Sequence, residues 1–307
     1  MCHGHYFTGY SAFLIYCYVF ALPSIFISFA MGDVLFGTIE KWQGSKPWGR
    51  VLDAGTGVHS LKWMLNLETE GVTAITADTA MKNLICQDPS VKIRPIDSIL
   101  VGNWIDDVFC SETLGDNRYD TILADYLIGA VDGFAPYTQD IILQKLKQFL
   151  APEGRLYIVG MEPIPEHATG PAHIITEVRR ARDACIQLAG HRPYREYPLT
   201  WISRTLENSQ FQLRKIKKFT ILHNEDSIMR QLKVAQNKIP LLSPSLQKGM
   251  ETYLNELGQK VQVAVGSTQN GKIPLSFDYV ILADNLLSTE NFYVEDLMKL
   301  TDSPMES

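Results

Sequence analysis

From about residue 32 onward, short apolar runs alternate with longer segments in which apolar positions recur at helical spacing. This alternation is typical of strand–helix–strand units, whose parallel sheet is buried on both faces by helices. Strands are predicted at residues 50–53, 72–77, 98–101, 119–124, 155–160, 212–222 and 277–283. Helices are predicted at residues 32–42, 60–67, 79–86, 139–150, 174–189, 199–208 and 245–258. The pattern predicts an α/β fold with three layers, in which helices flank a doubly wound, mostly parallel sheet of seven strands.

Two stretches are longer than this alternation requires. Residues 161–211 carry a long helical excursion after the fifth strand, and residues 223–276 separate the sixth and seventh strands. We therefore expect one domain at residues 32–290 with these two helical insertions, followed by a tail at residues 291–307. One or both insertions are expected to cover a substrate at the ends of the strands.

The N-terminal segment, residues 1–31, differs from the rest. Residues 10–30 are almost all apolar and carry no charge, and their length matches the ~20 residues that a membrane helix needs. A secretory signal is disfavoured because no Lys or Arg precedes the run, and basic residues after it, beginning with Lys41, favour a cytosolic domain. Translation from Met31 is the third interpretation. The protein is expected to be cytoplasmic, or membrane-anchored with its domain on the cytosolic side.

Composition argues against several functional classes. Hydrophobic residues make up 46% of the chain and charged residues 20%, as in ordinary globular proteins. The net charge of -6 disfavours a protein that binds nucleic acid through a basic surface. The five cysteines are scattered without a CxxC pair, and the seven histidines are dispersed. Neither a disulfide framework nor a metal site is therefore expected.

The most informative motif follows the first predicted strand and reads Asp53-Ala54-Gly55-Thr56-Gly57. Its glycines allow a tight turn and close approach of the backbone to a ligand, beside the free N–H groups of the next helix. The motif departs from the dinucleotide fingerprint GxGxxG, because Ser60 stands where the third glycine is required. It resembles motif I of the class I S-adenosylmethionine-dependent methyltransferases. A glycine-rich turn of another α/β protein is the alternative.

A second stretch adds to this resemblance. Leu150-Ala151-Pro152-Glu153-Gly154 and the apolar strand after it look like the turn into strand five of that family, where the pattern is Leu-x-Pro-Gly-Gly. Glu153 replaces the first of the two glycines. The resemblance covers about residues 34–284 and implies the class I methyltransferase fold with S-adenosyl-L-methionine as cofactor. In that family, the acidic residue and the glycines hold the methionine end of the cofactor.

Other candidate cofactor residues stand at the ends of predicted strands two to four, where ligands bind in open parallel sheets. Asp78 can accept hydrogen bonds from both ribose hydroxyls, or it caps the next helix. Asn103 can bind the adenine amine, and Trp104 either stacks on the ring or lies in the core. The residues expected to bind the cofactor are Asp53, Ala54, Gly55, Thr56, Gly57, Asp78, Asn103, Trp104 and Asp125.

The acceptor side is less defined, because methyl transfer from a sulfonium is an in-line displacement that mainly requires alignment of the acceptor. Asp125-Tyr126-Leu127 does not resemble the Asn-Pro-Pro-Tyr motif of enzymes that methylate amide or adenine nitrogens. Asp125, Tyr126 and His167 are the candidate catalytic residues, with His167 in a loop and able to act as a base near neutral pH. Further candidates for acceptor contacts are Asp132, Tyr137, Glu162 and His173.

The expected function is methyl transfer from S-adenosylmethionine to a small molecule, with a protein acceptor as the second expectation. Nucleic acid is not an expected partner, and membrane association would depend on residues 10–30. A non-catalytic protein that binds S-adenosylmethionine and an aminopropyl transferase on the same fold are the alternatives. Asp53 and Ser60 disfavour an NAD-dependent oxidoreductase.

Overall fold

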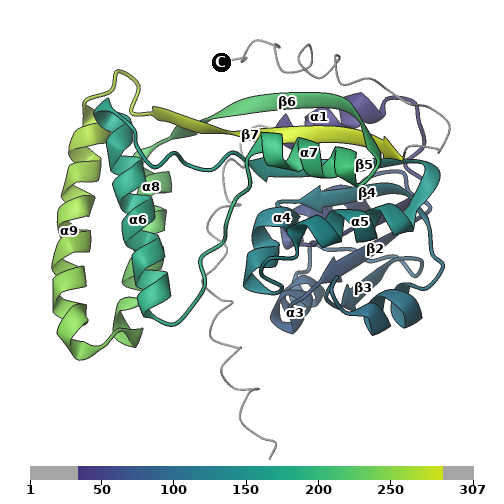
Figure 1. Ribbon diagram of the computed structural model, residues 1–307, viewed down its shortest axis with the longest axis horizontal. Helices are drawn as coiled ribbons and strands as arrows, with labels where there is room; N and C mark the ends of the chain where they lie inside the picture. The colour runs from purple at the N-terminus through teal and green to yellow at the C-terminus, as the bar shows by residue number, and fades with distance from the viewer. Residues whose placement is uncertain (1–33, 286–307) are drawn as a thin grey trace, which may run out of the picture. The chain divides into compact units, whose positions relative to one another are not determined.

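The computed structural model describes residues 34–285, and their arrangement is shown in Figure 1. The centre is one seven-stranded sheet with the order β3-β2-β1-β4-β5-β7-β6. The strands are β1 (Arg50–Asp53), β2 (Gly71–Thr76), β3 (Ser98–Val101), β4 (Tyr119–Asp125), β5 (Leu150–Met161), β6 (Phe211–His223) and β7 (Ile273–Asn285). The predicted seven-stranded α/β fold is therefore confirmed.

Strand directions define where a ligand can bind. β1 pairs in parallel with both β2 and β4, while β7 runs antiparallel between β5 and β6. The chain leaves β1 toward β2 and β3 on one side, then returns to β4 on the other, so the strand order reverses at β1. Open α/β sheets bind ligands at such a switch point, beyond the carboxyl ends of the strands. The glycine motif follows β1 at this point.

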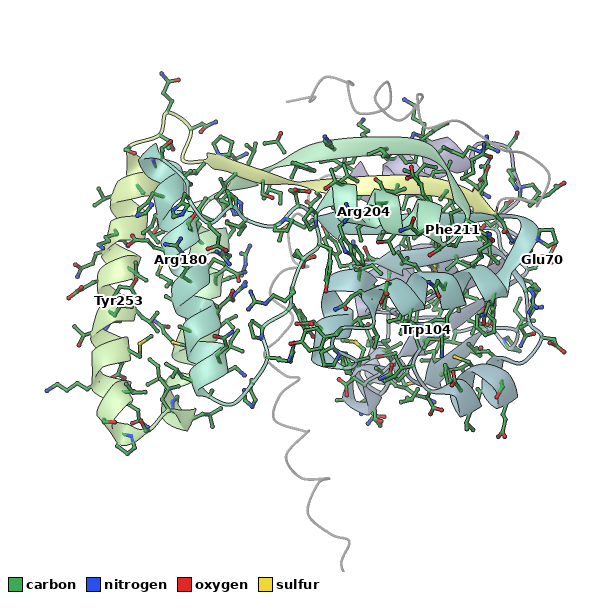
Figure 2. The ribbon with its side chains drawn as sticks, in the orientation of Figure 1. Glu70, Trp104, Arg180, Arg204, Phe211 and Tyr253 are labelled. Atoms are coloured by element: carbon green, nitrogen blue, oxygen red, sulfur yellow. The ribbon has the colours of Figure 1, made fainter. Side chains whose placement is uncertain are left out.

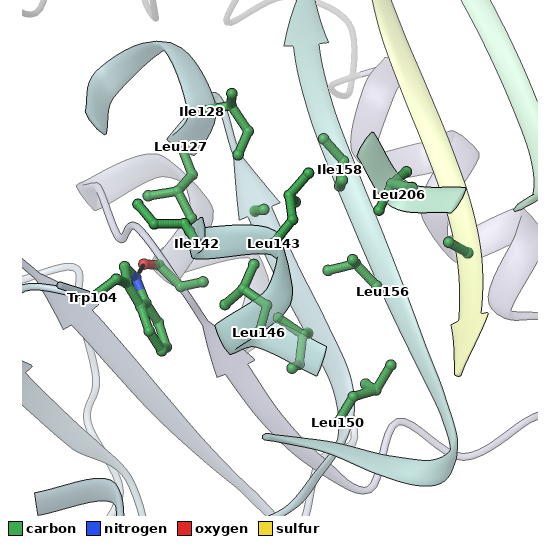
Figure 3. Close-up of a cluster of buried hydrophobic side chains, with 14 of the residues drawn as sticks. Trp104, Leu127, Ile128, Ile142, Leu143, Leu146, Leu150, Leu156, Ile158 and Leu206 are labelled. Atoms are coloured by element: carbon green, nitrogen blue, oxygen red, sulfur yellow. Dashed lines mark hydrogen bonds between the residues drawn. The ribbon is translucent and has the colours of Figure 1, made fainter. Parts of the chain in front are cut away.

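Helices cover both faces of the sheet. Gln43, at the end of α1 (Val34–Gln43), accepts a hydrogen bond from the Tyr157 hydroxyl of β5 at 2.8 Å. On the opposite face, α5 (Gln139–Phe149) and α7 (Leu199–Asn208) pack with the strands in one buried apolar cluster (Figure 3). The remaining helices of the sheet unit are α2 (Val58–Leu65), α3 (Thr79–Gln87), η1 (Phe109–Leu114), α4 (Leu127–Ala130) and η2 (Val131–Gly133).

A second compact unit consists of helices from two separate stretches, Thr169–His191 and Asn224–Lys272. Its helices are η3 (Gly170–Ala172), α6 (His173–Leu188), α8 (Glu225–Gln236), η4 (Ile239–Leu241) and α9 (Pro244–Gly266). The three long helices pack on one another around buried side chains such as Leu232 and Leu257. Helix α7 also lies within a predicted insertion, but it packs on β6 in the sheet unit.

Several elements differ from the predicted ones. The π-helix η1, the four-residue α4 and the whole of α8 were not predicted. Of these, η1 and α4 are too short to show a helical period. Helix α9 and strand β7 extend beyond their predicted limits at both ends. Strand β5 already begins at Leu150, directly after α5, and its register shifts before Arg155.

The N-terminal segment of residues 1–31 and the tail of residues 291–307 lie outside the described residues. Within residues 34–285, no helix combines the length and the apolar character needed to cross a bilayer.

Leu146→Ala is expected to destabilise the sheet unit by about 3 kcal/mol, because Leu146 is completely buried and its truncation leaves a cavity. Urea unfolding followed by tryptophan fluorescence measures this loss, since all five tryptophans belong to the sheet unit. The control is Leu84→Ala on α3, where the side chain is 52% exposed and a change within about 0.5 kcal/mol is expected. Equal effects of the two substitutions would contradict the position of Leu146 in the core.

Candidate functional site

Backbone hydrogen bonds to both neighbouring strands hold the glycine turn after β1. The Ala54 amide donates to the carbonyl oxygen of Leu123 on β4 at 2.9 Å, and the Thr56 amide donates to Ile75 on β2 at 2.7 Å. The turn therefore has a fixed position at the carboxyl end of the sheet.

Asp53, the last residue of β1, is completely buried. Its Oδ2 atom accepts a hydrogen bond from the Ser60 hydroxyl at 2.8 Å, whereas Oδ1 has no hydrogen-bond partner among the described residues. Burial raises the pKa of Asp53 to about 6, although Thr56, Ser60 and the Gly55 amide act to lower it. A buried carboxylate oxygen without a donor is unfavourable, and a cationic or donor group of a ligand would relieve this.

The two glycines have different surroundings. A Cβ atom on Gly55 would lie 2.7 Å from Cδ1 of Leu127, so the absence of a side chain allows α4 to pack against the turn. A Cβ atom on Gly57 would have no neighbour within 4 Å. Gly57 is the N-cap of helix α2 and has no side chain to bond the first helix amides, while its own amide donates to the Ser60 hydroxyl at 3.2 Å. Gly57 therefore borders open space beside helix N–H groups, which favour polar or anionic ligand atoms.

Asp78 is the N-cap of α3, and its carboxylate accepts hydrogen bonds from the amides of Ala80 at 2.8 Å and Met81 at 3.2 Å. The capping role expected as an alternative is thus present. Two carboxylate oxygens offer about four acceptor sites, so two remain for a ligand. Its predicted role toward a ribose stays a prediction.

Asn103 and Trp104 follow β3 but have different surroundings. The Asn103 side-chain amide donates to the Phe134 carbonyl oxygen at 3.3 Å, and the residue is only partly buried. Trp104 is 3% exposed and packs within the apolar cluster, and its indole N–H donates to the Ala54 carbonyl oxygen at 2.7 Å (Figures 2 and 3). Its ring therefore occupies the core position and not an open ligand surface, because α5 and the strands surround it.

The end of β4 carries Asp125 and Tyr126. Tyr126 has a φ of 46°, in the left-handed region that non-glycine residues rarely adopt, and its amide donates to Val159 at 3.0 Å. The Tyr126 hydroxyl donates to Oδ1 of Asp278 on β7 at 2.8 Å. Burial and the nearby carboxylates of Asp278, Asp125 and Glu196 raise the pKa of Tyr126 well above its usual value. Tyr126 is therefore a hydrogen-bond donor at neutral pH and not a base.

Of the other acceptor candidates, Asp132 and Tyr137 share Arg192 as a neighbour. His167 is exposed in the segment after β5 and has no hydrogen bond or ion pair within residues 34–285. Asp132 is buried near Gln139, and Tyr137 is exposed beneath the Arg192 guanidinium. Glu162 follows β5 and accepts from the Leu199 amide of α7 at 2.8 Å, while His173 is the first residue of α6 in the helical unit.

Three residues of the site were missed by sequence reasoning: Ser60, Asp278 and Glu196. Ser60 was noted only as a missing glycine, although the structure makes it the hydrogen-bond partner of Asp53. Asp278 was detectable as a carboxylate within an apolar strand segment. Glu196 lies in an irregular stretch before α7 and shows no signal in the sequence. Within residues 34–285, no group of three or more His, Cys, Asp or Glu side chains could hold a metal ion.

No protein-family model and no curated protein matches the chain. Solved structures are similar in fold. A candidate methyltransferase from Bacillus halodurans C-125 matches with a TM-score of 0.52 and 14% sequence identity, over 83% of this chain and 100% of that protein. The YcgJ protein from Bacillus subtilis matches with a TM-score of 0.50 and 18% identity, over 81% of this chain and 96% of that protein. The chain therefore has the class I methyltransferase fold that its motifs predict.

Proposed function

We propose that this protein is an S-adenosylmethionine-dependent methyltransferase that acts on a small-molecule acceptor. The observation that carries the proposal is the glycine turn at the switch point of a methyltransferase fold. There, a buried Asp53 has a carboxylate oxygen without a partner among the described residues, next to open space at Gly57. Buried polar groups without partners are uncommon in proteins, and each one calls for a physical explanation, such as a bound ligand.

The residues present fit the cofactor. Asp53 would interact with the ammonium group of its methionine end, directly or through water, and the backbone at Gly55 and Gly57 would allow close approach. Asp78 would accept hydrogen bonds from the ribose with its remaining lone pairs, and Asn103 would bind the adenine amine. Trp104 is not included among the contact residues, because it is buried in the core.

When bound, the cofactor supplies a methyl group on a sulfonium centre together with its leaving group. The protein then has to align an acceptor and manage any proton that the acceptor releases. At the end of β4, Tyr126 provides a protonated hydroxyl, and Asp125 and Asp278 provide acceptor oxygens. This arrangement would orient a polar acceptor, with a carboxylate as the group that receives the proton.

Calorimetry with S-adenosylhomocysteine and NAD tests the cofactor. We expect micromolar binding of S-adenosylhomocysteine and no binding of NAD, because Ser60 and the acidic Asp53 do not suit a dinucleotide. Binding of NAD alone would refute the proposal. Incubation of labelled cofactor with a cell extract then tests catalysis, where a mass increase of ~14 Da marks the acceptor, as one methyl replaces one hydrogen. Tight binding with no product across a broad acceptor panel would indicate a non-catalytic binding protein.

Tyr126→Phe is expected to lower kcat/KM for that acceptor about tenfold and to leave S-adenosylhomocysteine affinity within twofold. The reason is the loss of the hydroxyl that donates to Asp278, a charge-assisted bond on the acceptor side. Steady-state kinetics and calorimetry measure the two effects. Tyr157→Phe is the matched control, since its hydroxyl also makes a buried hydrogen bond, to Gln43, on the face covered by α1. An unchanged kcat/KM in Tyr126→Phe would show that Tyr126 is not part of the acceptor site.

A further inference from the structure

We infer that Trp104 is a positioning residue for the glycine turn: its indole N–H holds the Ala54–Gly55 peptide in the orientation that the methionine end of the cofactor requires. The inference rests on the proposed function, and it gives Trp104 a role without contact to the cofactor. It also accounts for the buried hydrogen bond that the indole N–H makes from within this cluster.

The geometry supports a fixed connection between two parts of the site. Nε1 of Trp104 lies 2.7 Å from the Ala54 carbonyl oxygen, and both residues are buried. Because β2 lies between β1 and β3 in the sheet, the bond joins loops that follow two non-adjacent strands. The indole itself is held by packing, since its ring lies 5.9 Å from the ring of Phe149 on α5. Figure 3 shows this bond at the edge of the apolar cluster.

The Ala54–Gly55 peptide needs such a partner. Glycine at position 55 places few steric limits on rotation of the peptide. The N–H groups before and after this peptide, those of Ala54 and Thr56, donate to carbonyl oxygens of β4 and β2. The carbonyl oxygen of the peptide itself, that of Ala54, accepts from the indole of Trp104. Without the indole donor, a buried carbonyl oxygen would lack its hydrogen bond, which favours rotation toward another donor.

Rotation of this peptide would also affect Asp53. The Gly55 amide belongs to the same peptide and is one of the groups that lower the pKa of the Asp53 carboxyl. Turning the carbonyl away from Trp104 would turn this amide away from Asp53. The expected effect is therefore confined to the methionine end, which Asp53 and the turn would contact in the proposed function. The ribose and adenine side, at Asp78 and Asn103, keeps its own hydrogen bonds.

The experiment compares two ligands on Trp104→Phe, a substitution that keeps an aromatic ring and removes the donor. We expect S-adenosylhomocysteine to bind about tenfold more weakly. 5′-Methylthioadenosine, which lacks the amino-acid end, is expected to keep its affinity within twofold. A general loss of structure would weaken both ligands alike, so the ratio of the two affinities separates positioning from a merely structural role.

Trp63→Phe is the matched control. It removes an indole N–H that donates to Oε1 of Glu40 at 2.6 Å, between α2 and α1 and outside the turn. We expect it to change the affinity for either ligand by less than twofold. If Trp104→Phe does not fold, benzothienylalanine at position 104 replaces the N–H by sulfur at nearly constant shape, and the same comparison applies.

An unchanged affinity for S-adenosylhomocysteine, or an equal loss for both ligands, would overturn the inference. A wild-type protein that binds neither ligand would refute the proposed function instead, which keeps the two failures distinct. If the Trp63 and Trp104 substitutions weaken ligand binding equally, the loss of affinity comes from removing an indole in general and not from the bond to Ala54.

Discussion

Asp53→Asn is expected to stabilise the protein at pH 7.5 and to weaken S-adenosylhomocysteine binding at least tenfold. The pKa of Asp53 is raised from 3.8 to about 6, so the folded protein holds the proton more tightly than the unfolded chain does. The free energy of unfolding of the wild type therefore falls as the pH rises from 3.8 to 6. A shift of this size corresponds to about 3 kcal/mol above pH 6. Asparagine has the same shape and no charge to bury, so it removes this penalty.

Urea unfolding at two pH values measures the stability effect. At pH 7.5 Asp53→Asn is expected to be more stable than the wild type by about 1–3 kcal/mol, and near pH 4 the difference should largely disappear. Asp88→Asn is the control, because it is expected to lower the stability at pH 7.5 where Asp53→Asn raises it. Lys62 and Ser90 lower the pKa of Asp88 to about 2, so its contribution is present above pH 3.8 and is lost as the pH falls toward 2. A stability gain that does not depend on pH would contradict the buried charge at Asp53.

Ligand binding should show the same titration. If the ammonium group of the ligand interacts with ionised Asp53, affinity for S-adenosylhomocysteine rises as the pH increases from 5 to 7. In Asp53→Asn this dependence should be absent, and the affinity low throughout. Calorimetry at three pH values checks both points. A wild-type affinity that is flat over this range would exclude direct pairing with Asp53.

Gly57→Ala is expected to leave the fold intact and to weaken S-adenosylhomocysteine binding by about 10- to 100-fold. The backbone of Gly57, with φ -119° and ψ 174°, is accessible to any residue, and an added Cβ would meet no protein atom within 4 Å. The stability change should stay within about 1 kcal/mol. The added methyl group would instead occupy space at the glycine turn that the proposed cofactor needs, and overlap of this size costs about 1–3 kcal/mol of binding.

Calorimetry and urea unfolding on the same preparations separate these two effects. Gly37→Ala on α1 is the matched control, because its Cβ also would have no neighbour within 4 Å and it lies in the same unit. We expect it to preserve binding and to stabilise the helix slightly. Normal binding by Gly57→Ala would show that no ligand approaches this glycine.

Local patterns in the sequence were sufficient for most of the fold. All seven strands were predicted near their observed places, and the parallel strands β1 to β5 were predicted from the apolar runs that burial on both faces of a parallel sheet requires. The glycine motif after residue 53 predicts a tight turn, and the structure places this turn at the switch point. The long β6 and β7 and the extent of α9 were predicted incompletely, because strand ends and helix ends depend on partners that are distant in sequence.

The sequence by itself therefore determined the sheet, the turn after β1 and the residue types around it. Only the tertiary structure decided which side chains meet there and with what chemistry. Antiparallel pairing of β7 brings Asp278 to Tyr126 across 152 residues, and packing of α5 buries Trp104 and directs its N–H to Ala54. Burial and ionisation depend on surroundings that assemble only when the chain folds. For this reason the sequence identifies Asp53 as a motif residue, but its raised pKa follows only from the structure.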